Sequence, residues 1–243
     1  DGEKPKAVFI GGQLVAENGK YVADDDYTPV EKPANTVNMP QINGPEDFIL
    51  KAPENCGEKT NIRILTREGG NAAIKQGKVV ELPVKDGAIS LEGEEGMQFV
   101  CVANRYGSGS KNVAVMDCFD LKYGAMATTV SHDSHNFTVF YKDIESAWAC
   151  AEYMKKNGGG MCAAKDGKVI GALNLPVAGL MSLKDCESLS AEIEDMENVL
   201  KGMCGEDFSL LMLVVFSLPV LPGLTLTDKG MIDGLTQTFV DMF

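Results

Sequence analysis

Histidine is the residue type whose scarcity matters most in this sequence. Only two histidines occur among 243 residues, and neither an HxH nor an HExxH pattern is present. A catalytic zinc-type site uses three or more protein ligands and keeps an open position. Two histidines would need carboxylates or cysteines from distant positions, which the sequence does not identify. We therefore expect no complete metal centre in this chain.

Basic residues are also few, and long apolar runs are absent. Lys and Arg number 22 against 35 Asp and Glu, which gives a formal net charge of −13. This sign disfavours nucleic acid and anionic membrane surfaces as partners. The longest apolar run, around residues 210–215, falls short of the roughly 20 residues that a membrane span requires. The first apolar run, residues 7–10, is too short for a signal peptide.

Paired cysteine motifs are missing as well. The seven cysteines are widely spaced, form no CxxC pair and mostly have apolar neighbours. This pattern fits free buried thiols in a reducing compartment better than a disulfide framework or a zinc ribbon. Apolar surroundings also raise the pKa of a thiol, which argues against a cysteine nucleophile. We therefore expect a cytoplasmic protein.

The sequence does contain a series of short strand patterns and two amphipathic helix patterns. The continuous apolar run at residues 97–103 predicts a buried central strand. Helices are predicted after Asp143 and after Ser182 or Asp185, because apolar residues follow at helical spacing. The other predicted strands are residues 47–50, 61–65, 79–83, 88–91, 112–116, 137–141 and the hairpin 161–173. Because these elements mix without strict alternation, we predict an α+β fold, with a mixed sheet and packed helices.

The N-terminal part is predicted to be distinct from the rest. Residues 7–22 read as a β-hairpin with glycine-containing turns, and residues 23–43 read as an extended linker rich in Pro and Asp. Two strands alone are marginal in water, so the hairpin must pack against something else. We place the boundary between residues 1–44 and residues 45–243.

Both histidines fall in one stretch, HDSHN at residues 132–136, after a run of small and β-branched residues. Imidazole titrates near neutral pH and is the commonest metal ligand. The candidate site residues are therefore His132, Asp133, His135 and Asn136, with His132 and His135 as the candidate metal ligands. Two hypotheses stay open. Either the histidines orient groups or line a pocket, or the stretch is a strand-end turn whose polar side chains satisfy loop backbone.

Several ordered blocks of the sequence resemble the adenine deaminases of the amidohydrolase superfamily. Residues 124–136, GAMATTVSHDSHN, resemble the GAIASTVAHDSHN stretch of that family. The other similar blocks are residues 9–20 (FIGGQLVAENGK), 157–169 (NGGGMCAAKDGKV), 175–182 (LPVAGLMS), 218–222 (LPVLP) and 226–230 (LTDKG). Because these blocks span nearly the whole chain in order, the resemblance indicates a family relationship.

The resemblance implies a role within a longer enzyme that converts adenine and water to hypoxanthine and ammonia in purine salvage. In that family a (β/α)8 barrel holds manganese or iron, and no part of the barrel matches this chain. Residues 1–44 would be the tail of a small β domain plus linker, and residues 45–243 the C-terminal α+β domain. The absence of an initial methionine agrees with a truncated or proteolysed chain.

The resemblance also implies the partners of the chain. They are the N-terminal barrel of the same enzyme, the purine substrate and further copies in a homo-oligomer, with neither nucleic acid nor membrane. The chain alone is then expected to bind no cofactor and to be inactive.

One position departs from the family pattern. Family members carry an Arg-His pair before a glycine, whereas this chain has Arg105-Tyr106-Gly107. If that histidine serves the active site, this homologue lacks it. Two alternative functions stay open. One is a stand-alone, non-catalytic domain for ligand binding or assembly, and the other a self-contained metallohydrolase that uses His132, Asp133 and His135.

Overall fold

The computed structural model describes residues 5–24, 31–67 and 75–243. The chain divides into two units, Asp1–Glu31 and Lys32–Phe243. In the first unit β1 (Ala7–Ile10), β2 (Gln13–Glu17) and β3 (Lys20–Tyr21) form an antiparallel sheet. The predicted hairpin is therefore extended by a third short strand. Residues 32–44, which the sequence placed with the N-terminal part, lie in the larger unit.

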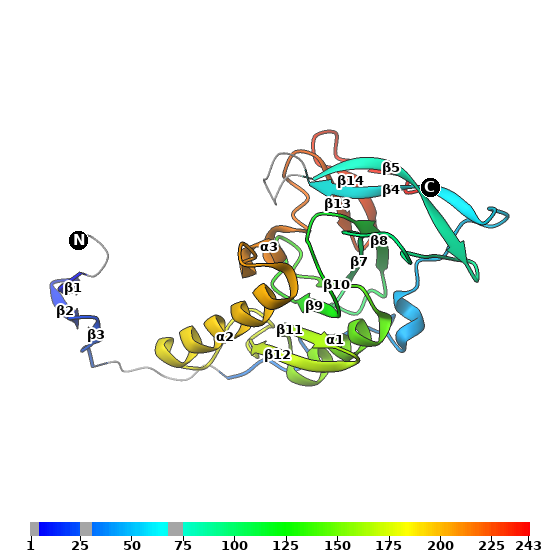
Figure 1. The fold of residues 1–243 in the computed structure, drawn as a ribbon. Coiled ribbons are helices and arrows are strands. Elements are labelled where there is room, and N and C mark those ends of the chain that lie inside the picture. Colours follow the sequence, from blue (N-terminus) through cyan, green and yellow to red (C-terminus); the bar gives the residue numbers. More distant parts are fainter. Residues whose placement is uncertain (1–4, 25–30, 68–74) are drawn as a thin grey trace. The chain divides into compact units, whose positions relative to one another are not determined.

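A nine-stranded mixed sheet organises the larger unit within the residues that the structure describes (Figure 1). Its order is β12-β11-β9-β10-β7-β8-β4-β5-β6, and all neighbours are antiparallel except β4 and β8, which are parallel. The strands are β4 (Lys59–Arg67), β5 (Lys75–Lys85), β6 (Ala88–Ile89), β7 (Gln98–Ala103), β8 (Lys111–Met116), β9 (Ala125–Thr128), β10 (Phe137–Tyr141), β11 (Gly160–Lys165) and β12 (Lys168–Asn174). The predicted α+β class is confirmed.

Each face of the sheet is covered by its own hydrophobic cluster. Along β7, Val100 and Val102 point into one cluster, and Cys101 and Ala103 into the other. This alternation follows from the two-residue period of a strand. The second cluster contains α1 (Ile144–Asn157), and the first contains α2 (Cys186–Cys204), α3 (Leu210–Val215) and a small antiparallel sheet of β13 (Leu224–Thr227), β14 (Gly230–Asp233) and β15 (Thr238–Val240). The predicted central strand at residues 97–103 is thus covered on both faces.

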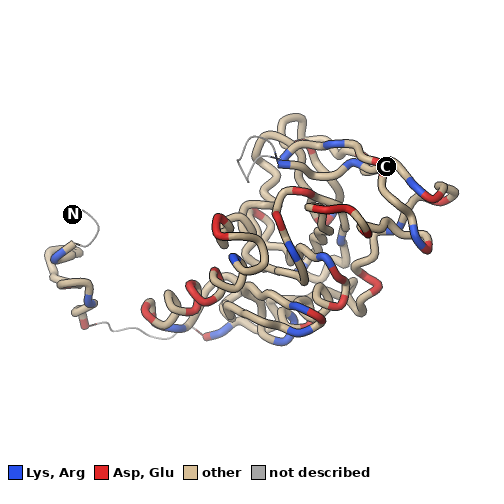
Figure 2. The backbone as a smooth tube through the Cα atoms, in the orientation of Figure 1, with Lys and Arg blue, Asp and Glu red and all other residues tan. Residues whose placement is uncertain are grey.

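The two long helices begin where the sequence predicts. The Asp143 carboxylate accepts a hydrogen bond from Ser146 N at 2.8 Å, and the Asp185 carboxylate accepts one from Ser188 N at 2.9 Å. Both are N-caps, which satisfy donors that the first helical turn leaves free. Acidic residues lie along α2 (Figure 2). In the described part of the chain, no helix has the length and apolar character needed to span a membrane.

The prediction of a strand at residues 47–50 is wrong. Residues Pro45–Phe48 form a 3-10 helix, η1. Pro45 at its start has a backbone angle already suited to a helix. The Asp47 carboxylate accepts hydrogen bonds from Asn43 N at 2.7 Å and Gly44 N at 3.2 Å. These local bonds stabilise a turn in a segment too short for its apolar residues to reveal a period.

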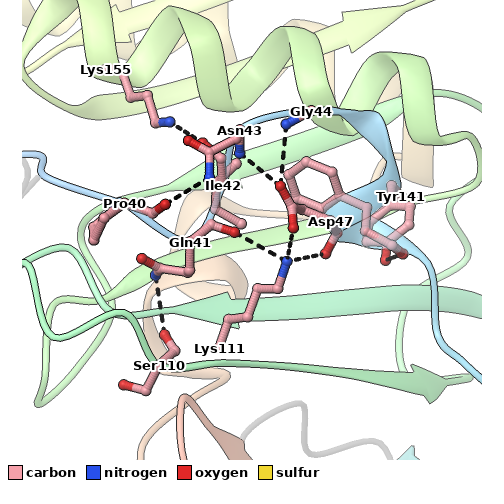
Figure 3. Close-up of polar contacts among 11 residues, drawn as sticks. Pro40, Gln41, Ile42, Asn43, Gly44, Asp47, Ser110, Lys111, Tyr141 and Lys155 are labelled. Carbon is pink, nitrogen blue, oxygen red and sulfur yellow. Dashed lines mark hydrogen bonds and ion pairs between the residues drawn. The ribbon is translucent and has the colours of Figure 1, made fainter.

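The segment around η1 is fixed to the sheet and to α1 by two lysines (Figure 3). Lys111 Nζ donates to the carbonyl oxygens of Gln41 at 3.1 Å and Asp47 at 2.8 Å, and pairs with the Asp47 carboxylate at 2.6 Å. Lys155 of α1 donates to the Ile42 carbonyl. Residues 41–47 are therefore held against β8 and α1.

Candidate functional site

The HDSHN turn, residues 132–136, connects β9 to β10. Hydrogen bonds at its start hold it in place. The backbone N–H of His132 donates to the Val214 carbonyl in α3 at 3.0 Å. The buried Ser131 hydroxyl lies 2.9 Å from the Thr138 hydroxyl and also contacts the Ser217 hydroxyl. These contacts hold the start of the turn against the first hydrophobic cluster, so its exposed side chains project from a fixed base.

The two histidine rings lie side by side on this turn. Their centroids are 5.3 Å apart with an interplanar angle of 57°. The His132 side chain is 47% exposed and the Asp133 side chain 66%, whereas His135 is half-buried. The turn therefore presents His132 and Asp133 to solvent, whereas His135 is less accessible.

The surroundings of the His135 ring favour its neutral form. Burial lowers its pKa first, and the neighbouring His132 and Arg105 lower it further, while Asp133 acts in the opposite direction. His135 Nδ1 is buried and has no hydrogen-bond partner among the described residues. A neutral imidazole offers one donor and one acceptor nitrogen, so this ring has hydrogen-bonding capacity that the chain does not use.

Asn136, the last candidate, has a structural contact instead of an exposed position. Its side chain is 3% exposed, and Nδ2 donates to Asp228 Oδ1 at 3.0 Å. Asp228 lies in the turn between β13 and β14. Its carboxylate also accepts a hydrogen bond from the Ser110 hydroxyl, and its carbonyl accepts one from Asn112 Nδ2 at 2.8 Å. Asp228 thus links the HDSHN turn to the loop before β8 and to β8 itself.

Arg105 and Tyr106, which follow β7, support the HDSHN turn from the other side. Arg105 Nε donates to the His135 carbonyl, and the Tyr106 hydroxyl donates to the Ser134 carbonyl at 2.7 Å. Arg105 is 2% exposed, while Tyr106 is 61% exposed. The aromatic ring that stands where the family pattern has histidine therefore lies at the surface beside the two histidines.

A hollow of about 300 Å³ adjoins this turn. It is lined by Ala34, Asn35, Thr36, Asn38, Arg105, Tyr106 and Ala178. A backbone bridge holds its wall together, since Asn38 N donates to the Arg105 carbonyl at 2.9 Å and Gly107 N to the Asn38 carbonyl at 3.1 Å. Its volume lies at the lower end of the range of small-molecule pockets. We call it the Arg105 hollow.

Sequence reasoning placed the histidines correctly on a strand-end turn but missed Arg105 and Asp228 as its supports. Arg105 appeared only beside a departure from the family pattern, and Asp228 only inside the LTDKG block. Both contacts join residues far apart in the sequence, 30 positions for Arg105 and His135 and 92 for Asn136 and Asp228. No local period or motif signals such pairs.

The chemistry available at this site is hydrogen bonding, stacking and charge. Among the described residues, no three His, Cys, Asp or Glu side chains are placed to hold a metal ion together. The described residues therefore do not fit a metal centre. Burial raises the pKa of Cys101, Cys118 and Cys204 to about 12, so these three thiols are not activated nucleophiles.

Comparison with known proteins identifies the family of this chain. Residues 69–238 match the family described as the adenine deaminase C-terminal domain. "Adenine deaminase 2" of Carboxydothermus hydrogenoformans is 35% identical over 98% of this chain and 41% of its own length. The "Adenine deaminase" proteins of Kosmotoga olearia and Clostridium botulinum are 33% and 31% identical, each over 97% of this chain and over 40% and 39% of their own lengths.

The chain thus spans about two fifths of the length of these curated relatives. The match extends over nearly all of this chain, and the family domain covers most of the larger unit. The chain belongs to the adenine deaminase family, within the region of its C-terminal domain.

Proposed function

We propose that this chain is the C-terminal part of a longer cytoplasmic hydrolase that converts adenine and water to hypoxanthine and ammonia in purine salvage. The support is the adenine deaminase name of relatives that are 30–35% identical over 97–98% of the chain. The metal of the reaction, manganese or iron, would be held by the N-terminal barrel of the longer protein. No step that we assign to this chain passes through it, and the chain alone would be inactive.

The role that we propose for this chain is to form an edge of the purine pocket with the HDSHN turn. The observation that carries it is the exposed His132 ring beside His135, whose buried Nδ1 lacks a partner in the described part of the chain. The exposed ring of Tyr106 adds an apolar face with a polar tip. Imidazole and phenol groups can stack on a planar heterocycle and hydrogen bond to its ring nitrogens. Asn136 would position the turn through Asp228.

The test uses the intact enzyme that carries this chain. His132→Ala and His135→Asn are assayed for adenine deamination, with Glu194→Ala on the exposed side of α2 as control. We expect kcat/KM to fall at least about tenfold in both histidine variants, equivalent to about 1.4 kcal/mol of transition-state stabilisation. The control should match the parent enzyme. Unchanged deamination by both histidine variants, with unchanged melting temperatures, would contradict the pocket-edge role.

The alternative function is a stand-alone domain for ligand binding or assembly. Two observations support this alternative function. The residues of this chain form the Arg105 hollow on its surface, and large apolar side chains of the larger unit are exposed, namely Leu211, Val220, Leu235 and Phe239. We expect homo-oligomers through such surfaces. Sedimentation of the 243-residue chain as a monomer at all concentrations would contradict assembly by this region.

A further inference from the structure

Arg105 carries a buried positive charge with no carboxylate partner in the described part of the chain. The side chain is 2% exposed. Nε donates to the His135 carbonyl, Nη1 donates to the Thr36 carbonyl at 3.1 Å, and Cζ lies 5.3 Å from the centroid of the Tyr106 ring. In that part of the chain, no carboxylate oxygen lies within 4.0 Å of the guanidinium, and Nη2 donates no hydrogen bond. Buried charges are normally paired, because removing them from water is costly.

The guanidinium is fixed in place by a close backbone approach on one side. A Cβ atom on Gly179 would lie 2.5 Å from Arg105 Nη1 and 2.8 Å from Thr129 Oγ1, and Gly179 has φ of +68°. Only glycine allows the chain to pass this close in this conformation. With Nε and Nη1 also engaged, Arg105 cannot turn away to find a counter-charge elsewhere. Nη2 is thus the guanidinium nitrogen that has no hydrogen-bond partner among the described residues.

The Arg105 hollow gives such a partner access. Arg105 lines it together with Asn38 and Tyr106, both of which are exposed. Asn38 holds its position through its backbone alone, since its side-chain amide makes no hydrogen bond within the described residues. A second donor is thus free beside the buried cation. The hollow combines a fixed guanidinium, an unused amide and an aromatic wall.

We propose that the Arg105 hollow binds an oxyanion, a carboxylate or phosphate group, through Arg105 Nη2 and the Asn38 amide. Guanidinium groups bind such anions through strong, directional hydrogen bonds. The net charge of −13 makes general attraction of anions by this chain unfavourable, so binding here depends on the local geometry. Adenine is neutral, so the bound anion is not the substrate of the proposed deamination, although Tyr106 borders both sites. The oxyanion is either a free small molecule or an acidic side chain from another part of the longer protein.

The test titrates the 243-residue chain with sodium phosphate and, separately, sodium acetate. Ionic strength is kept constant with sodium chloride, and binding is followed by calorimetry and by the NMR signal of Arg105 Nε–H. We expect saturable binding of one anion per chain and a shift of that signal. The absence of saturable binding by both anions would overturn the proposal.

The informative variant is Asn38→Asp, which places a carboxylate of nearly the same shape at the rim of the hollow. This carboxylate should neutralise Arg105 and weaken anion binding at least about tenfold, or about 1.4 kcal/mol. The matched control is Asn198→Asp, the same change on the exposed side of α2, which contributes no residue to the hollow. Equal binding by both variants would overturn the assignment. Because Asn38 is exposed and its side chain makes no described hydrogen bond, the fold should survive the substitution.

The same titration of the intact protein distinguishes the two sources of the oxyanion. Binding by the intact protein as well as by the 243-residue chain would identify a free anion as the ligand. Binding by the chain but not by the intact protein would identify an acidic side chain of the longer protein as the occupant. Both outcomes require that the isolated chain bind the anion.

Discussion

The Asn136 amide donates to the Asp228 carboxylate at 3.0 Å and so ties the end of the HDSHN turn to the turn between β13 and β14. Asp228 is 9% exposed and accepts three hydrogen bonds in all, from Asn136, Ser110 and Asn112. Two of these go to its carboxylate. The Asp228 side chain therefore joins the turn between β13 and β14 to the HDSHN turn and to the loop before β8.

Replacing this carboxylate should loosen that junction. Asp228→Ala removes two hydrogen bonds to a charged group and leaves the buried Asn136 amide without its acceptor. We expect the free energy of unfolding to fall by about 2–4 kcal/mol. Urea denaturation measures the loss. Asp207→Ala, a change at an exposed aspartate, is the control and should lie within about 0.5 kcal/mol of the parent chain. Equal stability of the two variants would contradict the role of Asp228.

The pH dependence of stability should report on His135. Its pKa in the folded chain is lowered from the ordinary value of 6.5, first by burial and then by His132 and Arg105. Between the lowered pKa and 6.5 the unfolded chain binds more protons than the folded chain, so stability must fall as pH decreases through this range. We expect the melting temperature of the parent chain to drop as the pH is lowered from 7.5 to 5.5. The drop should be smaller in His135→Asn.

Asparagine is the appropriate replacement because His135 has φ of +50°, a left-handed conformation that asparagine tolerates well. Carboxylates with lowered pKa, such as Asp47 and Asp233, lose their contribution only as pH falls below their ordinary value of 3.8. These carboxylates therefore do not contribute to the change in stability between pH 7.5 and 5.5. The same pH slope in parent and variant would show that His135 is not the group responsible.

The elements that the sequence predicted correctly are those with a local signal. Residues 97–103 form a covered central strand because seven residues in a row are almost entirely apolar, and α1 starts at Asp143 because a capping side chain precedes a helical period. The prediction of a strand at residues 47–50 was wrong because four residues are too few to show a period. There, the carboxylate of Asp47 and the constraint of Pro45 decided the conformation.

The candidate site was predictable only in part. Its location followed from the rarity of histidine, since both residues fall on one turn. Which side chains are exposed and which are anchored depends on contacts between distant segments. Nothing local distinguishes Asn136, buried against Asp228, from His132, open to solvent. The Arg105 hollow also requires residues 34–38 to lie against the segment after β7, where Asn38 exchanges backbone hydrogen bonds with Arg105 and Gly107. Lys111 fixes the segment that follows, at residues 41–47.

Lys111 should therefore contribute measurably to stability. Its Nζ donates to two carbonyl oxygens and pairs with the Asp47 carboxylate in a partly buried setting, with both side chains about a quarter exposed. Lys111→Met keeps the length of the side chain and removes these bonds, so we expect a loss of about 1–3 kcal/mol in urea denaturation. Lys59→Met breaks an exposed ion pair with Glu81 and should cost under about 1 kcal/mol. A smaller loss for Lys111 than for Lys59 would contradict this ranking.

The last prediction concerns the backbone behind Arg105. Gly179→Ala places a Cβ atom 2.5 Å from Arg105 Nη1 at φ of +68°, so the variant suffers both a clash and backbone strain. We expect it to lose more than about 1 kcal/mol of stability and to shift the NMR signal of Arg105 Nε–H.

Gly202→Ala is the matched control, because this glycine lies within α2 and its Cβ would meet no atom within 4 Å. That substitution should stabilise the chain by up to about 1 kcal/mol, since alanine favours the helix. If Gly179→Ala lowers the free energy of unfolding and Gly202→Ala raises it, the two effects differ because of the space around each glycine. The loss in Gly179→Ala would then reflect the close approach to the guanidinium and not the replacement of a glycine as such. Equal effects of the two substitutions would remove the evidence that Arg105 is fixed by its backbone neighbour.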